Sequence, residues 1–205
     1  MHEKDQRTAQ NVHNMIYHIG DFVVLWNTCE GALRHLLAHL SGGGVSYDIL
    51  AAHMNPNALL HAVRTFGNDV VEAPFDDHIG HAAEYFDRLR AYRNYYVHGI
   101  HSISADAGGD AVGLANELSA RGRLVLHPKE IRIGELLDVM RKMAIFRNYV
   151  YHLINFYQWT RDNTFHTYAE FKVPPEKPPM PPKLEKPKLY PLDEEPTSGK
   201  TEGGS

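Results

Sequence analysis

The stretch Arg88-Leu89-Arg90-Ala91-Tyr92-Arg93-Asn94-Tyr95-Tyr96-Val97-His98-Gly99 decides the fold that we predict for this chain. Apolar residues precede it at three- and four-residue spacing, which is typical of an amphipathic helix that packs on a core. They are Ile79, Ala82, Ala83, Phe86 and Leu89. A glycine directly after the last periodic residue is a common left-handed helix stop. We therefore expect Gly99 to end the helix and His98 to lie in its final turn.

Three polar residues in this stretch stand out by their spacing. Arg93 follows Phe86 by seven residues, so a guanidinium occupies a position where the pattern favours an apolar side chain. Asn94 and His98 are four residues apart and share a helix face. Arg93 and His98 are five apart, which is roughly 140° around an α-helix. One helix alone is therefore expected to align Arg93 and His98 poorly.

These residues resemble the R-polar-x-x-x-H signature of the HEPN superfamily, here Arg93-Asn94-x-x-x-His98 at the end of a long helix and followed by Gly99. The resemblance implies an all-α helical bundle over about residues 8–168 that dimerises so that two motifs face each other. Many members are metal-independent endoribonucleases, often toxins, defence components or RNA-processing enzymes, and need no cofactor. The motif is short, so its weight depends on the helix-end context.

The resemblance assigns roles to named residues. His98 is the expected general acid or base, because an imidazole titrates near neutral pH. Arg93 is expected to stabilise charge on the phosphoryl oxygens, and Asn94 to orient His98 or hold a phosphate oxygen. We predict a composite site at a homodimer interface, since one helix separates Arg93 from His98. Arg88 and Arg90 would add positive potential for RNA, and Tyr95 would stack on an unpaired base, as would Tyr92 or Tyr96.

Less specific interpretations of the same residues remain open. Arg93 would pair with an acid such as Glu30 across the bundle, and His98 would only interact with the helix dipole. A catalytically inactive module that binds RNA, nucleotides or a protein partner is the alternative function. A net charge of −4 counts against the ribonuclease and suits this alternative, because any contact with RNA would have to be made by a local basic patch. A cognate antitoxin or another protein is a further partner that the sequence leaves open.

Composition predicts where such a protein works. The chain has 205 residues, 43% of them hydrophobic, which suits one globular domain and an appendage. Cys29 is the only cysteine, so no disulfide can form within the chain. A charged N-terminus and the absence of an apolar run long enough for a membrane span predict a cytoplasmic protein that does not contact membranes.

The rest of the chain divides into a helical domain, 1–172, and a tail, 173–205. Helical spacing runs from Val12 to Leu40, and further helices are expected over 47–54, 56–66 and 133–165. Between Gly99 and the last helix, residues 100–104 alternate and residues 123–126 resemble a strand, which predicts a small β-hairpin insertion. The tail holds nine of the twelve prolines, at 174, 175, 178, 179, 181, 182, 187, 191 and 196. We expect it to be disordered, so that its removal leaves the melting temperature nearly unchanged.

A second match to the motif lies in the predicted last helix, at Arg147-Asn148 and His152. No glycine ends the helix after His152, so we expect its imidazole to lie against a neighbouring helix as a buried polar pair or a dimer contact. The fourteen histidines also raise the question of a metal site, for example at His35 and His39. None has the third and fourth ligands that zinc requires, so no metal site is predicted.

Overall fold

The computed structural model describes residues 3–69, 75–118, 126–162 and 176–185. Its elements are α1 (Glu3–Leu40), α2 (Val45–His53), α3 (Pro56–Asp69), α4 (Phe75–Arg93), a π-helical turn η1 (Asn94–Gly99), β1 (Ile100–Ala105), β2 (Ala111–Leu118), β3 (Leu126–Arg132) and α5 (Ile133–Asp162). The prediction of a mainly helical fold is confirmed.

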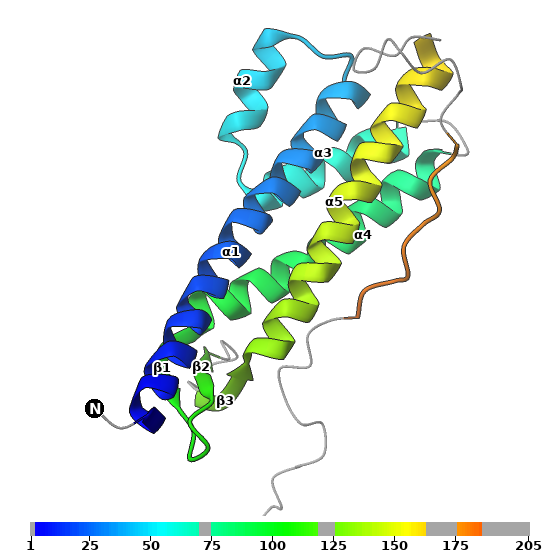
Figure 1. Ribbon diagram of the computed structural model, residues 1–205. Coiled ribbons are helices and arrows are strands. Elements are labelled where there is room, and N and C mark those ends of the chain that lie inside the picture. Colours follow the sequence, from blue (N-terminus) through cyan, green and yellow to red (C-terminus); the bar gives the residue numbers. More distant parts are fainter. Residues whose placement is uncertain (1–2, 70–74, 119–125, 163–175, 186–205) are drawn as a thin grey trace, which may run out of the picture.

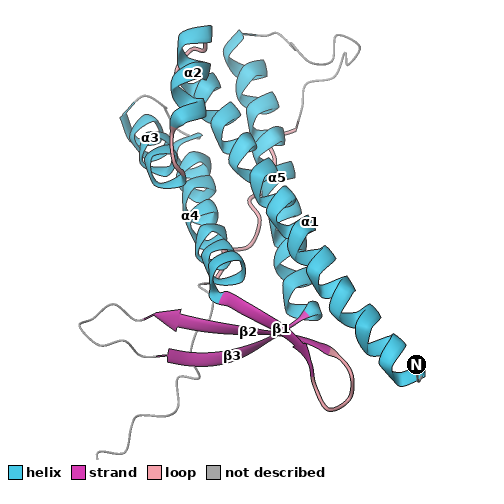
Figure 2. Ribbon diagram, turned by 90° about the vertical axis from the view of Figure 1, so that its left-hand side faces the viewer, coloured by secondary structure: helices cyan, strands magenta, loops and turns pink. Residues whose placement is uncertain are grey.

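The long helices α1 and α5 run side by side, and α3 and α4 pack beside them, with the sheet at one end of the bundle (Figures 1 and 2). An aromatic stack joins three of these helices. Trp26 of α1 lies 4.9 Å from Phe86 of α4, and Phe86 lies 6.0 Å from Phe146 of α5. All three rings are buried, so the apolar stripe that precedes the motif faces the core as predicted.

The insertion after the motif is larger than the predicted hairpin. It is a three-stranded antiparallel sheet in the order β1-β2-β3, and the central strand β2 was not predicted. The Ala-rich and Asn-containing sequence of β2 has weak strand propensity, and pairing on both sides compensates for it. A tight turn joins β1 to β2, since Gly109 has φ 87° and donates its backbone N–H to the Asp106 carbonyl. Of the residues predicted as a strand at 123–126, only Leu126 lies inside the described ranges.

Gly99 does not act as the left-handed stop that we predicted. The described glycines with positive φ are Gly42, Gly43, Gly44 and Gly109. The helix instead widens into the π-helical turn and passes directly into β1, where Ile100 has extended backbone angles (φ −71°, ψ 117°).

The tail residues that the structure describes, 176–185, form no helix or strand, but they pack on the bundle. Pro178 and Pro181 are buried, and Leu184 packs against the hydrophobic core. The prediction of a disordered tail is therefore not confirmed for this segment, because apolar residues three apart give an extended backbone one face that can pack. Residues 186–205 lie outside the described ranges.

Glycines in α3 and α4 give a test of how closely these two helices pack. A Cβ added to buried Gly67 would lie 2.6 Å from Cγ2 of Ile79, whereas one added to exposed Gly80 would meet nothing within 4 Å. We expect Gly67→Ala to lower the free energy of unfolding by about 1 kcal/mol or more, because overpacking outweighs the gain in helix propensity. Gly80→Ala should raise it by roughly 0.5–1 kcal/mol. Urea unfolding measures both, and equal stabilisation by the two variants would contradict this close packing.

Candidate functional site

The π-helical turn brings Arg93 and His98 together within one chain. In a π-turn the hydrogen bonds join residues five apart, so such residues lie about 50° apart around the axis rather than about 140°. Nη1 of Arg93 contacts Nε2 of His98 across this turn. The expectation that one helix aligns the two residues poorly is therefore wrong, because it assumed α-helical geometry up to Gly99.

The contact also indicates the tautomer of His98. A guanidinium can only donate hydrogen bonds, so Nε2 of His98 is the acceptor and the imidazole proton is on Nδ1. His98 is exposed and Arg93 is half-buried. The pair thus exposes to solvent an imidazole whose Nε2 lies next to the positive charge of Arg93.

Two tyrosines inside the turn hold it against the core. Tyr95 and Tyr96 are 8% and 4% exposed, and their rings pack edge to face at 5.3 Å. Tyr96 also lies 5.4 Å from Phe22 of α1, and burial raises the pKa of its phenol. The structure contradicts the predicted base stacking by Tyr95, because its side chain belongs to the hydrophobic core.

Asn94 has a different partner from the one predicted. Its side-chain oxygen accepts a hydrogen bond of 3.2 Å from Nη1 of Arg93. Asn94 therefore orients the arginine rather than the histidine. Since Asn94 is exposed, its position also leaves it at the solvent face of the pair.

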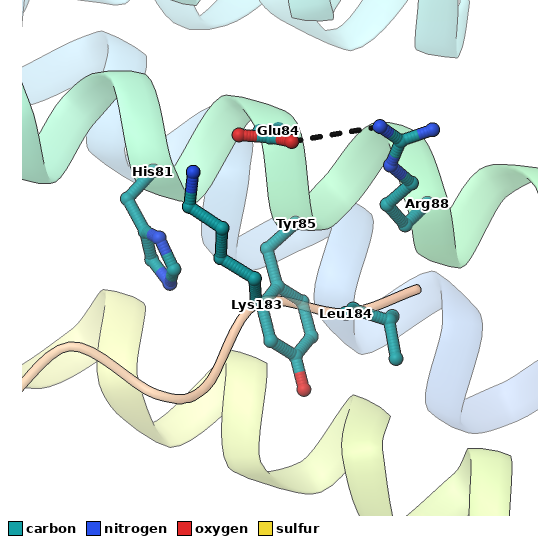
Figure 3. A pocket seen from close by; sticks show the side chains of 6 residues that line it. All are labelled: His81, Glu84, Tyr85, Arg88, Lys183 and Leu184. Atoms are coloured by element: carbon teal, nitrogen blue, oxygen red, sulfur yellow. Dashed lines mark hydrogen bonds and ion pairs between the residues drawn. The ribbon is translucent and has the colours of Figure 1, made fainter. Parts of the chain in front are cut away.

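The two arginines that were predicted to attract RNA form ion pairs within α4. Arg88 lies 3.5 Å from Glu84, and Arg90 lies 2.7 Å from Asp87 and also contacts Asn57. Arg88 also lines a pocket together with Lys183 and Leu184 of the packed tail segment (Figure 3). These neighbouring carboxylates weaken the positive potential that the sequence suggested near Arg93.

The second motif copy does not form the same pair. Arg147 donates to Oδ1 of Asn148 at 3.1 Å, and within the described part of the chain no hydrogen bond joins it to His152. Both residues lie in the regular α-helix α5, where a spacing of five separates them around the axis. His152 is exposed, so the prediction that it lies against a neighbouring helix is wrong. Glu30, the predicted alternative partner of Arg93, contacts Arg34 instead.

An open apolar groove of about 460 Å³ borders the motif, and sequence analysis did not identify it. It is lined by residues of α1, η1 and β1, namely Val12, Ile16, Ile19, Tyr96, Val97, Ile100, Ser102 and Ile103. Ile16 lies in the helix whose apolar spacing begins at Val12, but it is 54% exposed. The groove and the Arg93–His98 pair share the same π-helical turn, through Val97 and His98.

The remaining candidates for chemistry have structural partners. Among residues 3–69, 75–118, 126–162 and 176–185, no three His, Cys, Asp or Glu side chains are grouped so that they could hold a metal ion. The thiol of Cys29 is buried and donates to the Met143 carbonyl at 3.3 Å, and burial raises its pKa to about 12. Such a thiol is a poor nucleophile.

No described helix is long and apolar enough to cross a membrane.

Comparison with known proteins adds no further constraint. No protein-family model matches the chain, and neither a curated protein nor a solved structure matches it.

The tautomer of His98 tests the geometry of the pair. In the neutral form of the imidazole we expect the proton on Nδ1, because Arg93 donates to Nε2. Arg93→Ala removes this donor, so the ring nitrogen chemical shifts measured by NMR should move toward the Nε2–H form. Arg147→Ala is the matched control and should leave the spectrum of His152 unchanged. A His98 tautomer that does not respond to Arg93→Ala would contradict the contact.

Proposed function

We propose that this protein is a metal-independent endoribonuclease of the HEPN type, with Arg93 and His98 as its catalytic residues. The observation that carries the proposal is the contact between the guanidinium and the imidazole across the π-helical turn, at a position open to solvent. The single cysteine, with its buried thiol, suits a cytoplasmic location, where RNA is available.

The proposed reaction uses the RNA ribose as its nucleophile. His98 accepts the 2′-hydroxyl proton through Nε2, the 2′-oxygen attacks phosphorus, and the bond from phosphorus to the 5′-oxygen breaks. The products are a 2′,3′-cyclic phosphate and a 5′-hydroxyl, whose proton comes from a second acid. Arg93 exchanges its contact with Nε2 for the phosphoryl oxygens, which its planar donors suit well. Asn94 keeps the guanidinium oriented during this exchange.

A homodimer would supply the second acid. The apolar groove beside the π-helical turn leaves Ile16 and Val97 accessible, and a second copy of the chain is the occupant we propose for it. In an isologous dimer the two grooves face each other, and the two copies of His98 lie near the axis. One imidazole would then act as base and the other as acid.

Substitution of the pair tests the catalytic assignment. With purified full-length protein and a single-site RNA substrate, His98→Ala or Arg93→Ala should lower the cleavage rate by ~10²-fold or more. His152→Ala and Arg147→Ala are the matched controls, since their sequence spacing is the same but they form no pair, and their effects should be small. Cleavage should persist in chelator, because both proton transfers are assigned to imidazoles.

A substrate with 2′-deoxyribose at the scissile nucleotide lacks the nucleophile and should not be cut. Cleavage of that substrate, or full activity of folded His98→Ala protein, would overturn the mechanism. Retained RNA binding without cleavage would favour the alternative, an inactive RNA- or nucleotide-binding module. The ion pairs of Arg88 and Arg90 and the net charge of −4 weaken the attraction for RNA, and they favour the form of the alternative that binds a protein partner.

The assembly is tested separately. We expect a homodimer at micromolar concentration by light scattering, and Ile16→Glu should convert it to a monomer by placing a charge in the apolar groove. Ile145→Glu is the control, because Ile145 is also exposed (45%) but lies on α5 and does not line the groove. A monomeric parent protein, or equal behaviour of the two variants, would overturn the dimer.

A further inference from the structure

The packed tail segment 176–185 has the burial pattern of a polyproline II ligand. Its inward positions are Pro178, Pro181 and Leu184, three residues apart, and the positions between them are exposed. A polyproline II helix has three residues per turn, so every third side chain lies on one face. Prolines at four of these ten positions fix the backbone in extended conformations before it binds.

The segment follows α4 in the same direction. Lys177 acts electrostatically on His78, the Pro181 carbonyl accepts a hydrogen bond from the His81 imidazole, and Lys183 and Leu184 line a pocket with Arg88. From 177 to 184 a polyproline II helix advances roughly 22 Å. From 78 to 88 an α-helix advances roughly 15 Å, and the side chains of Lys183 and Arg88 extend beyond their backbones. The two elements therefore stay in contact over roughly two to three turns of each.

The surface beneath the segment, which we call the proline groove, is formed by His81, Glu84, Tyr85 and Arg88 of α4. Figure 3 shows the segment passing over the Tyr85 ring, with Lys183 extending toward α4 near His81 and Glu84. Tyr149 of α5 supports the groove from behind, edge to face with His81 at 5.8 Å. Aromatic-lined grooves are the usual receptors for polyproline II segments, because the flat rings fit between the prolines.

The pKa values of His78 and His81 also depend on the segment. Burial lowers the pKa of both His78 and His81, and Lys177 lowers the first further while Lys183 lowers the second. Asp77 acts in the opposite direction on His78, and Glu84 does so on His81, as does the hydrogen bond with the Pro181 backbone. Both imidazoles are therefore neutral ring surfaces at neutral pH, which suits contact with proline.

We infer that the proline groove is a peptide-binding site for sequences of the form Pro-x-x-Pro-x-x-Leu, and that the chain's own segment 176–185 is its resident ligand. This binding is separate from the proposed nuclease activity and uses none of its residues. Covalent connection keeps the resident segment at an effective concentration on the order of millimolar, so a free peptide must compete against it.

A fluorescently labelled peptide with the sequence of residues 176–186 tests the inference in the full-length protein. The double variant P178E/P181E replaces the inward prolines and should release the resident segment. The peptide should then bind at least about tenfold more tightly than to the parent protein, as measured by fluorescence anisotropy. The control P179E/P182E removes the same number of prolines and adds the same charge at exposed positions, so it should behave like the parent.

Substitutions in the peptide test which positions of the segment face the proline groove. With the released protein P178E/P181E, a peptide that carries glutamate at positions 178 and 181 should lose binding, whereas one with glutamate at 179 and 182 should keep it. P178E/P181E should also melt a few degrees below the parent protein, and P179E/P182E should not. The inference is overturned if the peptide does not bind the released protein, if it binds the parent equally well, or if the two registers are indistinguishable.

Discussion

The π-helical turn from Asn94 to Gly99 is the constraint on which the rest of the site depends. A π-turn has poorer geometry than an α-turn, so tertiary contacts must favour it. Here the contacts are those of Tyr95 and Tyr96, two consecutive aromatic side chains that are both buried. Phe22 of α1 fixes the second ring at 5.4 Å. Core packing on one side of the turn therefore determines which polar side chains meet on the other.

This explains why two identical spacings have different outcomes. Arg93 and His98 meet, whereas Arg147 and His152 do not, although five residues separate the members of each pair. The spacing of two residues in the sequence gives their distance in space only when the type of helix is known. Tyr149, the first of two tyrosines in the second copy, is also buried, but it lies in a regular helix and its hydroxyl is 2.9 Å from Nδ1 of His78. Burial of one ring does not require an extra residue in the turn.

Much of the fold was predictable, because long periodic segments leave little choice. The apolar stripe of α4 fixed its buried face, and Asn55 before Pro56 marked the start of α3, where its side chain accepts the Ala58 N–H at 3.0 Å. The candidate site was predictable in composition but not in geometry. Arg93, Asn94 and His98 could be named from the sequence, but the π-turn, the burial of Tyr95 and the ion pairs of Arg88 and Arg90 arise from tertiary contacts. The three-residue period of the tail was visible in the sequence, but only the groove shows that it is used.

The direct passage from η1 into β1 has a mechanical consequence. Arg93 ends a helix that the aromatic stack fixes in the bundle, while His98 lies two residues before the first residue of the sheet. The pair thus lies at the junction between the helical bundle and the sheet. A change in the angle between the sheet and the bundle is therefore expected to change the distance between the guanidinium of Arg93 and the imidazole of His98.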